Sequence, residues 1–168
     1  MEKAARALNR NIGDPPFAAL LDDIRSMWNV GSMFRSADGA GVGKLYLCGI
    51  TACPPRKEIT KTSLGAEEVI PFEYHVSALD AIIPMKSRGV KIVSLEVEER
   101  SIPLSSFSPT PPLCLVVGNE VTGVSREVLD ASDAIVRLPM RGVKGSLNAA
   151  VAFGIAAYAI AARLFGGE

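Results

Sequence analysis

The sequence predicts an α/β fold with a mostly parallel β-sheet covered by helices on both faces. Short apolar runs typical of buried strands alternate with segments of helical periodicity, which is the pattern of a parallel sheet. The chain of 168 residues is long enough for one domain with a sizeable core. Hydrophobic residues make up 48% of it and charged residues 21%, a globular rather than a disordered composition. We therefore expect one domain over residues 1–168, with a short basic N-terminal arm at about 1–15.

Five apolar runs are expected to form the strands. They are FAALLDDI (17–24), KLYLCGI (44–50), VKIVSLEV (90–97), LCLVVG (113–118) and AIVRLPM (134–140). Helices are expected between the first two strands and over SALDAIIPMKSRG (77–89), SREVLDAS (125–132) and about 147–165. The Pro/Ser-rich stretch SIPLSSFSPTPP (101–112) is expected to be a loop within the domain, because a strand-like run follows at once.

The first candidate functional residues lie in the helix that is expected after the first strand. Asn29 is a good N-cap residue. An apolar stripe of helical spacing follows at Val30, Met33, Phe34 and Ala37. Arg35 lies off this stripe, so the helix can pack its apolar face while it presents Arg35 and Asn29 to a cleft. A capped surface helix with a solvated arginine is the alternative.

The glycine-rich run DGAGVG (38–43) resembles a dinucleotide-binding loop in composition only. Such a loop follows a strand and opens a helix. Here the helical pattern comes first and the strand follows. We therefore expect Gly39, Gly41 and Gly43 to end the helix and turn the chain.

The run LVVGNEVTGVS (115–125) places an acid directly after a buried strand. Ligands of open parallel sheets collect at the carboxyl ends of strands. Gly118 lies where the chain must turn sharply or let a ligand approach closely, and Glu120 follows it. Ser125 is expected to cap the next helix, with Glu127 favouring its dipole. Alternatively, Glu120 is only a solvated loop acid.

The run LPMRGVKGSLN (138–148) joins the last strand to the last helix. It carries Arg141 and Lys144, and Ser146 or Asn148 lies at the start of the helix. Two cations, exposed backbone N–H groups and a helix N-terminus suit a phosphate or another polar ligand. A plain connection capped by Ser146 is the alternative.

Several cellular contexts and kinds of site are not expected. The uncharged run from Ala149 to Ala162 is shorter than the ~17–25 residues of a spanning helix, so it is expected to be buried in the core or against a second subunit. The N-terminus has no continuous apolar region of the kind found in signal peptides, so we expect a cytoplasmic protein.

The three cysteines form no CxxC pair and His75 is the only histidine, so neither a metal site nor a His-dependent centre is expected. Lys+Arg and Asp+Glu both total 18, so a nucleic acid must be held by a local basic patch.

Taken together, three of these segments resemble the three motifs of the SpoU (TrmH-like) branch of the SPOUT RNA methyltransferases. They are Asn29-x-Gly31-x-x-x-Arg35, LVVGNEVTGVS (115–125) and LPMRGVKGSLNAAVA (138–152). Their order and spacing agree with the family, and the resemblance extends from about residue 17 to 165. It implies a C-terminal trefoil knot, a rare exception to unknotted chains, and a homodimer with the final helix near the interface.

The resemblance also implies the reaction and its residues. S-adenosylmethionine is expected to lie in the knot and to donate a methyl group to a ribose 2′-hydroxyl of RNA, without a metal ion. The implied cofactor-binding residues are Leu95, Gly118, Leu138, Met140 and Leu147. The implied catalytic residues are Asn29, Arg35, Glu120, Ser146 and Asn148. The implied RNA-binding residues are Arg35, Arg141 and Lys144.

The expected role of Arg35 is to bind the phosphate and stabilise the developing alkoxide, since a guanidinium keeps its proton. Glu120 is expected to orient Arg35 or Asn29. The size of the chain favours a tRNA, at the anticodon wobble position or the D-loop guanosine, and ribosomal RNA is the alternative. From other classes, a non-catalytic α/β module for RNA or nucleotides and a flavodoxin-like phosphate-binding domain stay open.

Overall fold

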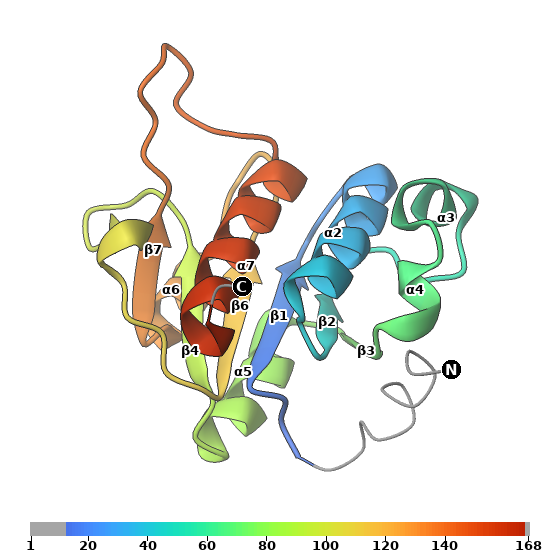
Figure 1. Ribbon diagram of the computed structural model, residues 1–168, viewed down its shortest axis with the longest axis horizontal. Coiled ribbons are helices and arrows are strands. Elements are labelled where there is room, and N and C mark those ends of the chain that lie inside the picture. The colour runs from blue at the N-terminus through green and yellow to red at the C-terminus, as the bar shows by residue number, and fades with distance from the viewer. Residues whose placement is uncertain (1–12, 167–168) are drawn as a thin grey trace.

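The computed structural model describes residues 13–166, so most of the expected basic arm at about 1–15 lies outside the described residues (Figure 1). The described residues form one seven-stranded sheet in the order β3-β2-β1-β6-β4-β7-β5, and all neighbouring strands are parallel. The strands are β1 (Phe17–Asp22), β2 (Leu45–Cys48), β3 (Phe72–His75), β4 (Lys91–Leu95), β5 (Ile102–Pro103), β6 (Leu113–Val117) and β7 (Ala134–Arg137). The predicted parallel α/β sheet is confirmed, whereas the trefoil knot stays a prediction.

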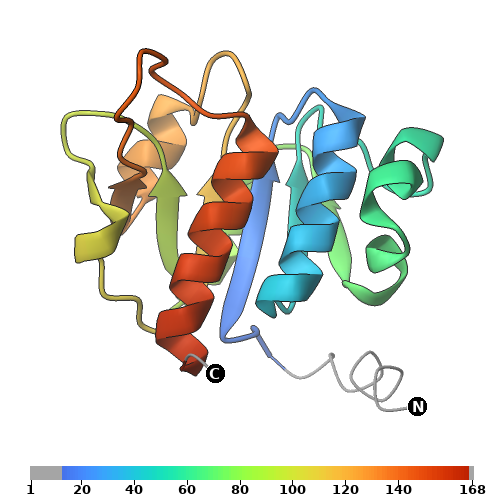
Figure 2. The same cartoon turned by 45° about the horizontal axis from the view of Figure 1, so that its top comes forward.

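Helices cover both faces of the sheet. They are α2 (Met27–Ala40), α3 (Lys57–Ser63), α4 (Ala66–Val69), α5 (Ala78–Ser87), α6 (Arg126–Ala131) and α7 (Ala149–Phe165), with a 3-10 turn η1 (Leu104–Ser106). Side chains of β1 alternate between the faces: Leu21 packs with α2 and α7, and Leu20 packs with α5 and α6. Figure 2 shows α2 and α7 side by side on one face.

The central strands are buried on both faces, which explains their continuous apolar sequences. Every residue of β1 and β6 is buried, and β6 lies in the middle of the sheet between β1 and β4. The loops after β1, β4, β6 and β7 therefore meet at one edge of the sheet. This edge is at the top of Figure 2, where the long loop before α7 also lies.

Several elements were not predicted from the sequence. Strand β3 is short and only half-buried, and α3 and α4 are single short helices without a clear apolar period. The expectation that 101–112 is entirely loop is wrong at Ile102–Pro103, which pairs with β7 at the edge of the sheet. Two residues that pair with a single neighbour leave no periodic signal.

The helix ends are partly as predicted. Ser125 caps α6 and Gly41 ends α2 in the left-handed conformation, as expected. The prediction that Asn29 is an N-cap is wrong, because α2 begins one turn earlier and the Ser26 hydroxyl accepts from the Asn29 N–H. Asn148, and not Ser146, caps α7 through its side-chain oxygen.

The final helix α7 is buried on one side only. Phe153, Ala156, Ala157 and Ile160 are buried in the core, whereas Val151, Ile155 and Tyr158 are about half exposed. No helix within residues 13–166 is long and apolar enough to cross a membrane. The exposed apolar stripe of α7, defined here as Val151, Ile155 and Tyr158, is thus left without a covering element of the described chain.

Gly31 of the first motif sets the contact between α2 and α3. A Cβ atom at this position would lie 2.1 Å from Thr62 Oγ1 and 2.3 Å from the carbonyl oxygen of Ile59. We expect Gly31→Ala to lower the free energy of unfolding by roughly 1–3 kcal/mol, because α3 must move away. Urea unfolding measures this. Gly142→Ala is the control, since its Cβ would meet nothing within 4 Å. Equal effects of the two substitutions would contradict the packing argument.

Candidate functional site

A cavity of about 470 Å³ lies at the carboxyl ends of the central strands. Its walls come from the loops after β4, β6 and β7, as expected for an open parallel sheet. The structure places all five residues that the sequence assigned to a cofactor around this cavity: Leu95, Gly118, Leu138, Met140 and Leu147. Glu120 and Ser146 line it as well.

Glu120 links this cavity to the start of α2. One carboxylate oxygen accepts from the backbone N–H of Arg25 at 2.9 Å. The other accepts from the Ser26 N–H at 3.1 Å and from Asn29 Nδ2 at 3.0 Å. Partial burial acts to raise the pKa of Glu120, but these donors outweigh it and hold that pKa below its usual range. Glu120 is therefore a fixed, charged acceptor and not a free loop acid.

Asn29 continues this chain of hydrogen bonds to the third motif. Asn148 Nδ2 donates to Asn29 Oδ1 at 3.2 Å. Asn148 Oδ1 in turn accepts from the backbone N–H groups of Ala150 and Val151, so the same side chain caps α7. The Glu120–Asn29–Asn148 chain thus joins the three motifs, which lie far apart in the sequence.

Arg35 does not join this chain. It is exposed on α2 in a separate hollow lined also by Ser36, Lys61 and Tyr158. Its guanidinium makes no hydrogen bond or ion pair with any residue in the described part of the chain. Of the two partners expected for Glu120, the structure shows Asn29 and not Arg35. The reason is helix geometry, because six residues separate Asn29 from Arg35 by about 9 Å along the axis.

The loop 138–148 is the most exposed part of the site. Arg141 and Lys144 are exposed and form no ion pair with a described residue. Ser146 lies beside the cavity, in the same loop. The two predicted RNA-binding cations of this loop are thus accessible at the edge of the cavity.

Gly118 is required by the protein's own backbone. A Cβ atom here would lie 2.5 Å from the carbonyl carbon and oxygen of Gly123 and from the nitrogen of Val124. The loop after β6 folds back on itself, and the Gly123 N–H donates to the Asn119 carbonyl at 2.9 Å. The close approach expected at Gly118 is therefore made by the loop itself.

Glu96 is a cavity residue that the sequence did not indicate. Its carboxylate oxygens accept from the Val97 N–H at 2.8 Å and from the Val124 N–H at 2.9 Å. It therefore connects the loop after β4 to the loop after β6. The run LEVEER (95–100) holds three acids and resembles a solvated turn. Only the direction of the Glu96 side chain distinguishes it from its neighbours.

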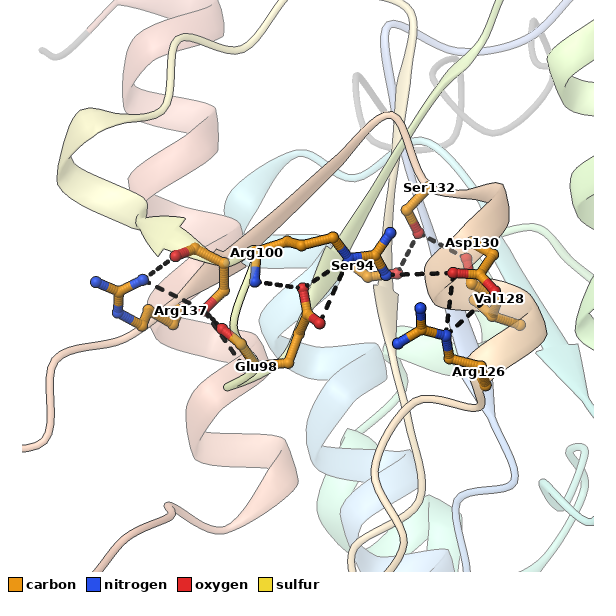
Figure 3. A network of polar contacts seen from close by, with 9 residues as sticks. Ser94, Glu98, Arg100, Arg126, Val128, Asp130, Ser132 and Arg137 are labelled. Atoms are coloured by element: carbon orange, nitrogen blue, oxygen red, sulfur yellow. Dashed lines mark hydrogen bonds and ion pairs between the residues drawn. The ribbon is translucent and has the colours of Figure 1, made fainter.

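A polar network supports the cavity wall beyond Glu96 (Figure 3). Glu98 Oε1 accepts from the backbone N–H of Arg100 at 2.9 Å, and Arg100 Nη2 pairs with Asp130 of α6 at 3.3 Å. Arg137 of β7 donates to the carbonyl of Ser101. Exposed ion pairs stabilise little individually. Their effect here is to hold the 96–101 loop against α6 and β7.

Other polar groups do not assemble into a metal site. Within residues 13–166, no group of three or more His, Cys, Asp or Glu side chains is arranged to hold a metal ion. His75 lies on β3 beside Glu73, at 3.4 Å, and does not line the cavity.

Glu96→Ala is expected to loosen the cavity wall, because two backbone N–H groups lose their acceptor. The free energy of unfolding should fall by about 1–3 kcal/mol. Hydrogen exchange at the Val97 and Val124 amides should accelerate. Glu99→Ala is the matched control, since Glu99 is exposed and its side chain forms no hydrogen bond or ion pair with a described residue. Unchanged exchange at Val124 in Glu96→Ala would show that Glu96 does not connect the loops.

Comparison with known proteins supports the sequence motifs. Residues 16–158 match the SpoU rRNA Methylase family. The TrmH family protein YacO of Bacillus subtilis is 32% identical over 158 residues, which are 94% of this chain and 61% of that protein. The match covers 61%, 64% and 62% of the first three curated relatives, so the chain spans less than two thirds of their length.

Solved structures agree with the fold. The AdoMet-bound rRNA methyltransferase of Sinorhizobium meliloti matches with a TM-score of 0.83 and 29% identity, over 92% of this chain and 59% of that one. A structure described for 2-OH methylation of C/U34 on tRNA matches with a TM-score of 0.78 and 25% identity, over 90% of this chain and 97% of that one. Because the family match covers residues 16–158 and hydrogen bonds join the three motifs, the chain belongs to the SpoU rRNA methylase family.

Proposed function

We propose that the protein is an S-adenosylmethionine-dependent RNA ribose 2′-O-methyltransferase. The observation that carries this proposal is the position of the cavity beside the Glu120–Asn29–Asn148 chain. A cavity for a small molecule thus lies next to polar residues from all three motifs. Glu120, which lines the cavity, and Asn29 and Asn148, which are hydrogen-bonded to it in series, are called the polar rim. Family membership and the AdoMet-bound structure of a related protein support it.

The cavity fits the cofactor in size and chemistry. Its volume of about 470 Å³ lies within the range of small-molecule sites. Leu95, Leu138 and Met140 offer apolar surface for an adenine ring, and the carboxylates of Glu96 and Glu120 suit a cationic sulfonium. When bound, the cofactor supplies an electrophilic methyl group.

The chain's own residues then have to position the acceptor hydroxyl. Glu120, Asn29 and Asn148 hold the starts of α2 and α7 in a fixed relation, so the rim keeps one geometry. Ser146 lies on this rim and orients the approaching ribose. Arg35 binds the phosphate and stabilises the charge that develops on the oxygen, while it keeps its own proton.

A homodimer explains the position of Arg35. Its hollow shares Tyr158 with the exposed apolar stripe of α7, so Arg35 lies beside the surface that a second copy would cover. We propose that this stripe is the subunit interface, and that Arg35 completes a cavity only across that interface. Burial of three half-exposed apolar side chains per subunit favours the association.

The substrate proposed is a tRNA in the cytoplasm. The structure described for C/U34 of tRNA is matched over 97% of its length, so the shared domain is nearly all of that protein. A tRNA (guanosine(18)-2′-O)-methyltransferase of Aquifex aeolicus is also a relative. Ribosomal RNA is the second candidate, favoured by the 23S rRNA (guanosine-2′-O-)-methyltransferase of Vibrio parahaemolyticus.

Cofactor binding and methyl transfer test the proposal directly. We expect calorimetry to show binding of S-adenosylmethionine, and labelled methyl groups to enter tRNA rather than rRNA. Mass spectrometry of tRNA and rRNA from a deletion strain should then identify the missing 2′-O-methyl nucleoside. Absence of binding at millimolar cofactor would leave a non-catalytic module as the better description. Label only in rRNA would move the substrate to the second candidate.

Arg35→Lys separates positioning from cofactor binding. Lysine keeps the charge but loses the bidentate geometry, so methyl transfer should slow about 100-fold while cofactor affinity stays unchanged. Glu120→Ala should instead lower both the rate of methyl transfer and the cofactor affinity, because Glu120 lines the cavity and binds Asn29. Arg88→Lys is the control, since Arg88 directly follows α5, pairs with Asp14 and does not line the cavity. Wild-type turnover in Arg35→Lys would refute the positioning role.

A further inference from the structure

Trp28 is a large aromatic side chain in an unusual place. It is the only tryptophan of the chain, and 46% of its surface is exposed. It lies in the first turn of α2, directly before Asn29, whose side chain binds Glu120. Its backbone is held in place, because Thr62 Oγ1 donates to the Trp28 carbonyl at 2.9 Å. The indole is therefore accessible, and its backbone is held in place one residue before Asn29.

A cation lies beside this ring, and further cations without acidic partners lie near Trp28 and Lys61 in the sequence. Lys61 of α3 places its Nζ 5.4 Å from the ring centroid. Arg25, Arg56 and Lys57 are exposed, and none forms an ion pair with a residue in 13–166. Figure 1 shows α2 and α3 packed together; Lys57 and Lys61 belong to α3, and Arg56 directly precedes it.

Five other cations of the described chain have acidic partners, whereas Arg35, Lys91, Arg141 and Lys144 have none. An acidic side chain pairs with each of Lys44, Lys86, Arg88, Arg100 and Arg126. The net charge of the whole chain is zero, so the cations without an acidic partner on or just before α2 and α3 are a local feature, though other unpaired cations lie elsewhere. A phosphate backbone complements such a patch, whereas an apolar protein surface does not.

We propose that Trp28 and Lys61 form a stacking site for an unpaired nucleobase of the RNA substrate. The base stacks on the exposed indole, and Lys61 with Arg56 and Lys57 binds the adjoining phosphates. An aromatic platform flanked by cations is how proteins bind single strands, because every base has a π-face but a base in a duplex has none free. This inference rests on the proposed function and names its substrate class: a nucleotide in a loop or single strand.

The position of Trp28 connects stacking with the reaction. Trp28 and Asn29 are neighbours in the chain, and Asn29 belongs to the polar rim through its bond to Glu120, which lines the cavity. A base held on Trp28 keeps its strand extended across this rim, where a neighbouring ribose can reach the cavity. The same arrangement disfavours a paired stem, whose bases stay stacked on each other.

The intrinsic fluorescence of the protein tests this site directly, since all tryptophan emission comes from Trp28. Titration with a short unpaired RNA should quench the emission, and a duplex of the same composition should bind more weakly and quench little. Filter binding should show that Trp28→Ala weakens binding of the unpaired RNA by roughly 5- to 150-fold. Trp28→Phe should retain most of the affinity. Ile83→Ala is the control, because Ile83 is an exposed apolar side chain on α5, which covers the other face of the sheet.

The salt dependence of RNA binding tests Lys61 separately. Lys61→Ala should reduce the slope of log affinity against log salt by about 1, as expected for one lost phosphate contact. Lys91→Ala, another exposed and unpaired cation, lies at the start of β4 and should leave the slope unchanged. Equal slopes for both variants and the wild type would remove Lys61 from the site.

Three results would overturn the stacking site. They are equal binding of duplex and unpaired RNA, unchanged affinity in Trp28→Ala, and emission that changes with protein dilution instead of with RNA. The third would assign the indole to a contact with a second copy of the chain. Calorimetry with S-adenosylmethionine separates this inference from the proposed function. If the protein binds the cofactor and methylates RNA but RNA does not change the Trp28 emission, the stacking site alone is refuted. If RNA quenches the emission but the cofactor does not bind, the proposed function alone is refuted.

Discussion

The hydrogen-bonded chain from Glu120 through Asn29 to Asn148 is the constraint on which the site depends. It joins a loop after the central strand to the starts of the two helices that cover one face of the sheet. The carboxylate of Glu120 lies at the positive end of the α2 dipole, which favours its charged form. The apolar core places the three segments near each other, and this polar chain determines how they meet.

Helix α2 packs in the core along one side and carries polar and exposed side chains along the other. Its buried stripe packs in the core, and Gly31 brings α3 into close contact. Asn29 points to the polar chain, while Trp28 and Arg35 stay exposed. Packing on two sides fixes the backbone of the helix, so the positions from which Trp28 and Arg35 project are set by the core. Arg35 has no hydrogen bond or ion pair with a described residue, whereas Trp28 lies beside Lys61.

The walls of the cavity are built largely by backbone and by acceptors for backbone. Gly118 and Gly123 let the loop after β6 fold tightly, and Glu96 binds the N–H of Val124. The network around Glu98 and Arg100 then supports the neighbouring loop from the side of α6. A cavity formed in this way keeps its shape because its polar backbone groups have partners within the protein.

The sequence by itself determined the parallel sheet, the central position of LCLVV and the three segments that carry the site, because apolar periodicity and motif spacing are local properties. The resemblance of these segments to a known family also indicated five of the residues that line the cavity. The sequence did not determine that Glu120 binds Asn29 rather than Arg35, that Glu96 connects two loops, or that Ser26 starts α2 one turn early. The short elements β3, β5, α3 and α4 escaped prediction as well. These features were decided only by the tertiary structure, because they depend on which backbone groups meet across long sequence separations, and no local pattern records that.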